Sequence, residues 1–241
     1  MNSILTEEEK LSLKGKGILA QKQDGYFAIR FLSKVGYFSA DDMIALANLA
    51  KKYGNGELSL TSRLTIEIPY IKESNLKDLL KEASLKGLVI GGAGPTVRAV
   101  VACKGSVCVH GLIDTRTLGE KIENEFLGRV LPNKFKIGVF GCVNSYGKAQ
   151  SNDLAVMPVK DLEKSEVEFL VFLGGRLGKK ARLGTPIKKR FKEEELIDLI
   201  EIVIDYYNKN AVGKERFAEV IERIGFSNVE NYIISEKLNK L

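Results

Sequence analysis

The spacing of apolar residues predicts alternating strands and helices in the first third of the chain. Two segments alternate apolar with polar residues and are rich in β-branched side chains, as strands are, and two have the three- and four-residue apolar spacing of amphipathic helices. In chain order these are a strand over 26–34, a helix over 39–54, a strand over 57–71 and a helix over 74–87. Ser39 is the expected N-cap of the first helix and Gly54 its expected end. This order predicts a small α+β domain over residues 1–88.

A second α+β domain is predicted over residues 89–241. The glycine-rich segment 91–95 breaks the preceding pattern, and its spacing is not that of a dinucleotide-binding loop, so we expect a domain joint there. Beyond it we expect strands over 97–103, 134–142, 153–157 and 166–175, and helices over 115–128, 193–210, 214–225 and the tail after 227.

Composition and charge narrow the function classes. The chain has 241 residues, of which 44% are hydrophobic and 28% charged, and no apolar run is long enough to cross a bilayer. No secretion signal is evident at the N-terminus, so we expect a cytoplasmic protein without membrane contact. A single histidine excludes a His-rich zinc site. The net charge of +6 indicates acidic partners, but basic residues are scattered without aromatic interleaving, so no nucleic-acid partner is expected.

Three cysteines carry the clearest chemical signal. Cys103 and Cys108 flank a four-residue loop, and Cys142 ends a predicted strand. An odd number of closely spaced cysteines is a poor disulfide framework and a better metal-ligand set in a reducing compartment. Thiolates on short loops at strand ends suit an iron–sulfur cluster, whose sulfides accept hydrogen bonds from backbone amides. Small buried thiols without a ligand role remain the alternative.

Segments over nearly the whole chain resemble the siroheme-dependent sulfite and nitrite reductases. The family has a first cysteine pair followed by a Gly-Cys-Pro-Asn-x-Cys segment, and it also has a Thr-x-Arg strand, a Gly-Gly loop and a Gly-Glu-Arg-Phe helix. The matching segments are ACKGSVCVHG, LPNKFKIGVFGCVNSYGKAQSNDLAV, ELSLTSRLTIEIPYI, GPTVRAVVAC, FLGGRLGKKARLG and GKERFAEVIERIG. The resemblance implies a ferredoxin-like half-module followed by a cluster-binding domain.

The resemblance also implies an activity and a set of roles. The family reduces sulfite to sulfide or nitrite to ammonia at a siroheme coupled to a 4Fe-4S cluster, with an acidic electron donor such as ferredoxin. The implied metal ligands are Cys103, Cys108 and Cys142, the implied anion-binding catalytic residues are Arg30, Arg98, Lys134 and Lys136, and the implied cofactor-binding residues are Arg63, Asn144, Tyr146, Lys148 and Arg182. Arginine suits carboxylates and oxyanions because it binds them through two parallel hydrogen bonds, and lysines beside the anion can deliver protons. Lys134 and Lys136 also alternate with Phe135, as the solvent face of a strand would.

The chain departs from the family pattern in the cysteine motif. Tyr146 stands where the family has its fourth cysteine, and four residues rather than five separate Cys103 from Cys108. Tyr146, His110 or water could complete the cluster, the site could stay open, or cofactor binding could be lost; His110 could equally be an ordinary loop residue.

The size of the chain raises a further expectation. Larger members of the family pair two such halves, with cluster cysteines from one half and anion-binding residues from the other. This chain has one half with candidates for both sets, so we expect a homodimer that shares its sites. The alternative is a non-catalytic or electron-transfer accessory protein on the same fold. A basic run over 179–190 fits either a solvated loop or contacts to cofactor carboxylates or an acidic ferredoxin.

Overall fold

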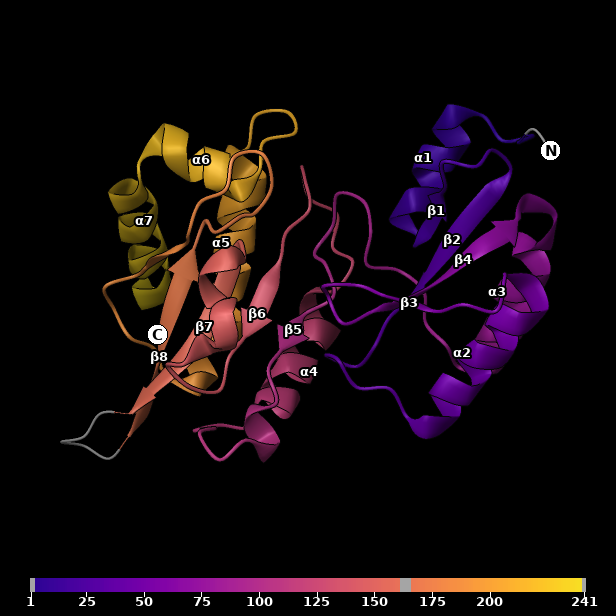
Figure 1. The fold of residues 1–241 in the computed structure, drawn as a ribbon. Helices are drawn as coiled ribbons and strands as arrows, with labels where there is room; N and C mark the ends of the chain where they lie inside the picture. The colour runs from indigo at the N-terminus through magenta and orange to yellow at the C-terminus, as the bar shows by residue number, and fades with distance from the viewer. Residues whose placement is uncertain (1–2, 161–165, 240–241) are drawn as a thin grey trace.

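The N-terminal half of the molecule is built on a four-stranded antiparallel sheet. The computed structural model describes residues 3–160 and 166–239. The strands β1 (Ile18–Ala20), β2 (Tyr26–Phe31), β3 (Ser59–Leu60) and β4 (Ile66–Lys72) lie in the order β1-β2-β4-β3 (Figure 1). Alternate residues of β2 and β4, such as Ile29 and Ile68, are fully buried, because successive side chains of a strand point to opposite faces.

Three helices belong to this half: α1 (Glu7–Gly15), α2 (Ala40–Tyr53) and α3 (Leu76–Leu85). Helix α2 begins with a capping box in which Ser39 and Asp42 bond each other's backbone amides, and it ends at Gly54, as the sequence predicts. Leu46 of α2 and Leu79 of α3 are fully buried in the core formed with β2 and β4. The two helices therefore cover the sheet through their apolar faces.

The second half is built on a mixed five-stranded sheet. Its strands β5 (Val101–Ala102), β6 (Ile137–Val139), β7 (Leu154–Lys160), β8 (Val167–Leu173) and β9 (Thr185–Pro186) follow chain order across the sheet. The pairs β5–β6 and β6–β7 are parallel, and the pairs β7–β8 and β8–β9 are antiparallel. The carboxyl ends of β5, β6 and β7 consequently meet at one edge.

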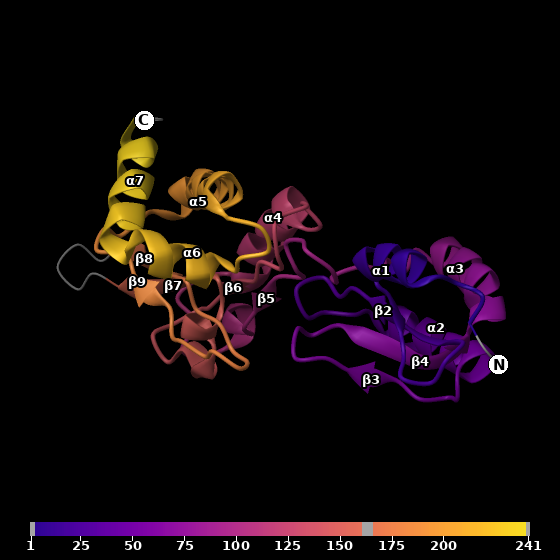
Figure 2. The same cartoon turned by 90° about the horizontal axis from the view of Figure 1, so that it is seen from above.

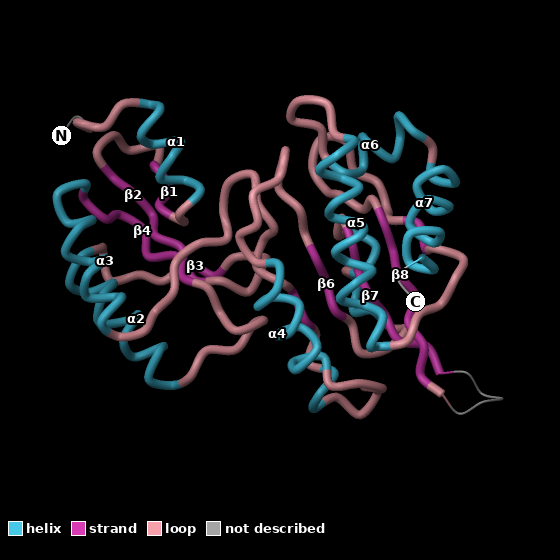
Figure 3. The backbone as a smooth tube through the Cα atoms, turned by 180° about the vertical axis from the view of Figure 1, so that it is seen from behind, coloured by secondary structure: helices cyan, strands magenta, loops and turns pink. Residues whose placement is uncertain are grey.

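The α-helices that the structure describes in this half lie on one face of the sheet (Figures 2 and 3). They are α4 (Thr115–Phe126), α5 (Leu196–Asn210), α6 (Phe217–Ile224) and α7 (Phe226–Asn239). Their apolar residues join the strands in the main core, where Phe135, Tyr207 and Phe217 have ring centroids 5.5–5.7 Å apart. The opposite face carries a smaller cluster of Phe140, Ala149, Ala155, Met157 and Phe172, against which Cys103 packs. Cys103 thus contacts the face of the sheet opposite the main helical core.

The structure confirms the predicted α+β class and corrects two elements. The single strand expected over 57–71 is wrong: β3 and β4 form a hairpin around a turn, closed by the Thr61 amide donating to the Thr65 carbonyl at 2.9 Å. The charged segment near the N-terminus forms α1, whose capping box joins Thr6 to Glu9. One sheet lies on each side of residues 88 and 89, and the boundary itself stays a prediction. Within 3–160 and 166–239, no helix is long and apolar enough to cross a membrane.

Candidate cofactor and anion-binding site

Cys103 and Cys142 lie at the carboxyl ends of two neighbouring parallel strands. Cys103 directly follows β5, and Cys142 comes three residues after the end of β6. The amide of Gly141 donates a hydrogen bond to Sγ of Cys103 at 3.1 Å. An amide aimed at a cysteine sulfur is the contact that stabilises a thiolate bound to iron.

Two glycines allow the cysteine loops to touch. A Cβ atom added to Gly141 would lie 2.8 Å from the Cα of Gly105, and one added to Gly105 would lie 3.1 Å from the Cα of Gly141. The loops are further tied by the Leu112 amide donating to the Gly141 carbonyl at 2.8 Å, and by Thr115 Oγ1 donating to the Cys103 carbonyl at 2.6 Å. Any side chain at either glycine would push the two cysteine loops apart.

Cys108 does not join the other two cysteines. It is exposed at the end of the 3₁₀ turn Gly105–Val107, whereas Cys103 and Cys142 are half-buried. Across the described parts of the chain, no three His, Cys, Asp or Glu side chains gather closely enough to hold a metal ion. The thiol donors and the Gly141 amide fit an iron–sulfur cluster chemically.

The loop after Cys142 carries three of the predicted cofactor-binding residues. Asn144, Tyr146 and Lys148 are all exposed, and the Tyr146 side chain is 91% exposed. Ser145 has φ +51° and Tyr146 has φ +25°, so two consecutive non-glycine residues lie in or near the left-handed region. Such backbone costs about 1–3 kcal/mol per residue and is concentrated at functional sites.

A third loop, over 174–184, borders the cysteine loops. The Gly184 amide donates to the Gln150 carbonyl at 2.7 Å. Arg182, predicted to bind the cofactor, instead lies against α6, where its Nη1 is 3.3 Å from both the Ala218 carbonyl and Glu222 Oε1. We refer to the loops 103–112, 141–152 and 174–184 together as the cysteine rim.

Arg63, the predicted siroheme contact, is half-buried between the two sheets. Its Nε donates to the Ala99 carbonyl at 3.0 Å, its Nη1 to Oδ1 of Asn152 at 2.8 Å and its Nη2 to the Ile137 carbonyl at 2.8 Å. Burial lowers the pKa of Arg63 to about 10. The guanidinium therefore ties the turn between β3 and β4 to the second sheet, and we call this region, with segment 91–99, the joint.

The four predicted anion-binding residues come together at the joint. Arg30 pairs with Glu67 at 2.7 Å, and Arg30 and Arg98 both donate through Nη1 to the Gly92 carbonyl, at 2.7 and 2.8 Å. The charge of Arg98 acts on Lys134, and the charge of Lys134 acts on Lys136. We call Arg30, Arg98, Lys134 and Lys136 the cation cluster.

Burial and mutual repulsion alter the proton affinity of the cation cluster. Burial, reinforced by Arg30 and Arg216, lowers the pKa of Arg98 to about 10. The pKa values of Lys134 and Lys136 are lowered as well, first by burial and then by neighbouring cations. A cluster of cations with this mutual repulsion suits an anion, which would relieve it, and a lysine with a lowered pKa gives up a proton more readily.

Two residues that the sequence analysis missed complete this region. Asp153, fully buried before β7, accepts hydrogen bonds at both carboxylate oxygens from Nη2 of Arg216 at 2.9 Å. Arg216 belongs to the segment GKERFAEVIERIG, quoted above for its resemblance, and Asp153 begins a predicted strand, but they are 63 residues apart. No spacing rule links them.

The cation cluster and the cysteines lie at opposite ends of β6. Lys134 and Lys136 precede this strand, whereas Cys142 follows it. At the rise of an extended strand, the six residues from Lys136 to Cys142 span roughly 20 Å. Within one chain the two sets of predicted residues therefore face different ends of the second sheet.

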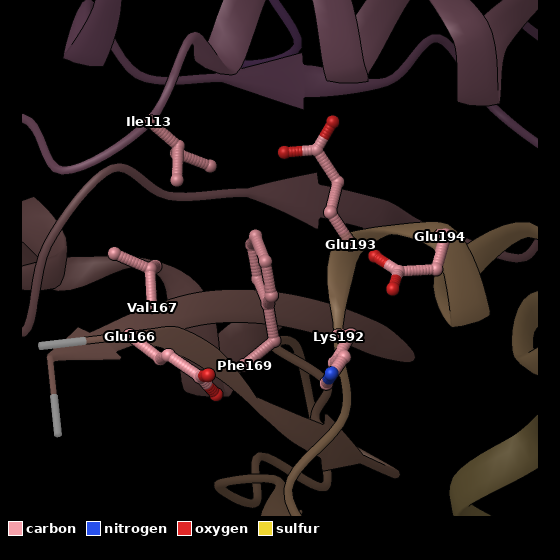
Figure 4. A pocket seen from close by; sticks show the side chains of 7 residues that line it. All are labelled: Ile113, Glu166, Val167, Phe169, Lys192, Glu193 and Glu194. Carbon is pink, nitrogen blue, oxygen red and sulfur yellow. The ribbon is translucent and has the colours of Figure 1, made fainter. Parts of the chain in front are cut away.

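A pocket elsewhere in the second half carries none of the predicted residues (Figure 4). Its lining includes Glu166, Glu193 and Glu194, together with Lys192 and Phe169. Three carboxylates against one ammonium disfavour an oxyanion, so this pocket is not the anion site.

The sequence and the fold both match known proteins. The family described as "Nitrite and sulphite reductase 4Fe-4S domain" matches residues 93–241, and the family described as "Nitrite/Sulfite reductase ferredoxin-like half domain" matches residues 19–85. The chloroplastic ferredoxin–nitrite reductase of Arabidopsis thaliana is 34% identical over 206 residues, which cover 83% of this chain and 35% of the relative. The coenzyme F420-dependent sulfite reductase of Methanocaldococcus jannaschii is 27% identical, over 87% of this chain and 42% of the relative.

A solved structure shows the same fold. The NirA protein of Mycobacterium tuberculosis superposes with a TM-score of 0.85 at 17% identity, over 98% of this chain and 48% of that chain. The present chain thus spans less than half the length of these proteins. Because the first family matches more than half of the chain, the chain belongs to the nitrite and sulphite reductase 4Fe-4S domain family, and this membership implies a 4Fe-4S cluster and siroheme as its cofactors.

Proposed function

We propose that the protein reduces a small oxyanion, sulfite or nitrite, with a siroheme and a 4Fe-4S cluster. The observation that supports this most directly is the gathering of Arg30, Arg98, Lys134 and Lys136 at the joint. When bound, the cluster and siroheme would relay electrons from an external donor, and the siroheme would supply the iron that binds the anion. Cys103, Cys108 and Cys142 would hold the cluster, and Arg63, Asn144, Tyr146, Lys148 and Arg182 are the proposed siroheme contacts.

The roles of the cation cluster follow from its chemistry. Arg30 and Arg98 would bind and orient the oxyanion through paired hydrogen bonds. Lys134 and Lys136, whose pKa values are lowered, would deliver the protons that convert each departing oxygen to water.

Two copies of the chain would assemble the complete site. The cations and cysteines of one chain lie at opposite ends of β6, so a second copy is needed to bring cations of one chain to cysteines of the other. Exposed apolar side chains on the cysteine rim support such packing. They include Val107, Val109, Val143, Tyr146, Leu177 and Leu183. Sedimentation of the cofactor-loaded protein as a dimer is expected, and a monomer with full cofactor content contradicts it.

An acidic electron donor such as ferredoxin, in the cytoplasm, belongs to the same proposal. Within the described residues, acids pair with four cations of the basic run over 179–190. These pairs are Lys180–Glu219, Arg182–Glu222, Lys189–Glu195 and Arg190–Glu168. The run is thus largely neutralised, so a donor would be drawn by the protein's overall positive charge more than by this loop.

The alternative is an accessory protein without the complete metal centre. The exposed Cys108 and the exposed Tyr146 in the fourth ligand position favour it. Absorption spectra and iron and sulfide content of anaerobically purified protein separate the two. A siroheme band with about five irons per chain, four from the cluster and one from the siroheme, supports the reductase. A broad charge-transfer shoulder alone supports an electron-transfer protein, and a colourless protein after reconstitution contradicts both metal-dependent functions.

A further inference from the structure

The Asp153–Arg216 contact joins four separate parts of the second half. Asp153 lies just before β7, and Arg216 is the N-cap residue of α6. Oδ2 of Asp153 also accepts the backbone amide of Lys136 at 2.9 Å, and the Asp153 carbonyl accepts the amide of Gly174 at 2.8 Å. Asp153 thus fixes the backbone of Lys136, the start of α6 and the Gly-Gly loop at once.

The contact is buried, so its charges act at short range. Asp153 is 0% exposed and the Arg216 side chain 12%. Burial raises the pKa of Asp153, and the Arg216 guanidinium and the Lys136 amide oppose this rise by donating to its carboxylate oxygens. Removing either partner would leave a buried charge without its counter-charge, which is costly in a low-dielectric interior.

The buried Asp153–Arg216 pair lies next to the lysines of the cation cluster. The charges that act on Lys136 are those of Asp153, Arg216, Arg63 and Lys134. Those that act on Lys134 are Asp153, Arg216, Arg98 and, from α1, Lys14. In each set Asp153 is the acid among cations. Among the described residues, the buried side-chain polar atoms without a hydrogen-bond partner are Nε of Arg98 and Nε of Arg216, and both belong to this neighbourhood.

We propose that Asp153 and Arg216 form a positioning pair for the oxyanion site, in which Asp153 anchors Lys136 and Arg216 limits the negative field that Asp153 exerts on the two lysines. The proposal rests on the proposed anion-binding role of the cation cluster. Neither residue touches the anion. Both act through Lys136 and Lys134, by holding them in place and by setting how readily they carry a proton.

The pair predicts opposite effects for its two members. Asp153→Asn removes the negative charge nearest the lysines, so they lose their protons at lower pH, with a midpoint about one pH unit below that of the unaltered protein. Arg216→Gln removes a cation and leaves Asp153 unopposed, so the midpoint moves up. The double variant Asp153→Asn with Arg216→Gln removes both charges and is expected near the original midpoint, a coupling that a double-mutant cycle measures.

The experiment follows the lysines and the anion separately in the full chain. Lysine ¹³Cε shifts are titrated by NMR, with Lys136 identified by the loss of its signal in Lys136→Gln, and nitrite affinity is measured by calorimetry over about pH 6 to pH 10, where nitrite keeps one charge. Arg223→Lys, at the exposed Arg223–Glu215 pair of the same helix, is the matched control and should move neither readout.

The outcomes test the positioning pair separately from the proposed anion-binding role of the cation cluster. The positioning pair is supported if the lysine midpoints of the two single variants move in opposite directions and the pH at which nitrite affinity falls moves with them. Unmoved lysine midpoints, with affinity lowered equally at every pH, overturn it in favour of simple packing. Lysine midpoints that shift in a protein that never binds nitrite support the pair's effect on the lysines but contradict the proposed anion site. If Arg216→Gln does not fold, Asp153→Asn and the double variant still show in which direction each charge moves the lysine midpoint.

Discussion

At the joint, Arg63 alone donates to three acceptors of the second half, and Arg30 and Arg98 share the Gly92 carbonyl. On the cysteine rim, Cys108 and Tyr146 are exposed, and two consecutive residues have positive φ. The predicted anion-binding residues are therefore held by contacts within the protein, whereas two of the predicted cofactor-binding residues are exposed on loops. The two regions should respond differently to substitution.

The largest expected effect is the loss of the cluster on removal of an exposed thiol. Cys108→Ser leaves the fold intact, because the side chain is exposed and not packed in the core. A reconstituted protein should fall from about four irons per chain to fewer than one, because only two cysteine ligands remain. Iron and sulfide analysis measures the loss and thermal unfolding of the metal-free protein tests the fold. Val107→Ala, in the same loop, should keep its iron; equal iron in Cys108→Ser would remove Cys108 from the ligand set.

At the joint we expect a substitution to lower the stability of the fold, whereas Cys108→Ser should leave the fold intact. Arg63→Met removes a buried guanidinium and leaves the Ala99 and Ile137 carbonyls and Asn152 Oδ1 without their donor. Since each unsatisfied buried acceptor costs about 1–3 kcal/mol, the free energy of unfolding should fall by about 3 kcal/mol or more. Denaturant unfolding measures it. Arg116→Met, which removes an exposed pair with Glu120, should cost less than about 1 kcal/mol. Equal losses in both variants would mean that Arg63 does not tie the halves together.

The same contrast explains which features the sequence predicts. The helix over 39–54 is predicted well because its capping box lies within four residues. The strand over 57–71 is wrong because Leu64 takes φ +59°, unusual for a non-glycine residue, while Arg63 beside it is bonded to Ala99, 36 residues away. Local patterns contain no information about such a tertiary contact. The four cations were predicted by resemblance, whereas the 63-residue separation of Asp153 and Arg216 hid their contact.

A smaller effect is expected when one member of the cation cluster is removed. Lys136→Gln keeps the backbone amide that donates to Asp153, so the joint should stay folded. Loss of a charge-assisted contact of about 1.5–3 kcal/mol should weaken nitrite binding roughly 10- to 100-fold. The difference should shrink at high pH, because the lowered pKa of Lys136 already removes its charge there in the unaltered protein. Calorimetry measures it against Lys160→Gln at the exposed end of β7, and a pH-independent loss would contradict a role for the ammonium charge.

The smallest expected effect comes from adding a fourth cysteine to the predicted cluster ligands. Tyr146→Cys supplies the fourth thiolate that the family pattern has, on a loop that already holds residue 146 close to Cys142 along the chain. Because the thiolate binds iron more strongly than the water or phenolate available otherwise, the cluster should survive a chelator several-fold longer. Tyr146→Phe tests the phenolate itself, and its cluster should decay as in the unaltered protein if Tyr146 is not a ligand. Faster decay in Tyr146→Phe, with no gain in Tyr146→Cys, would show that the tyrosine already closes the site. The cysteine rim would then be as complete as the joint, which would remove the contrast between the two regions.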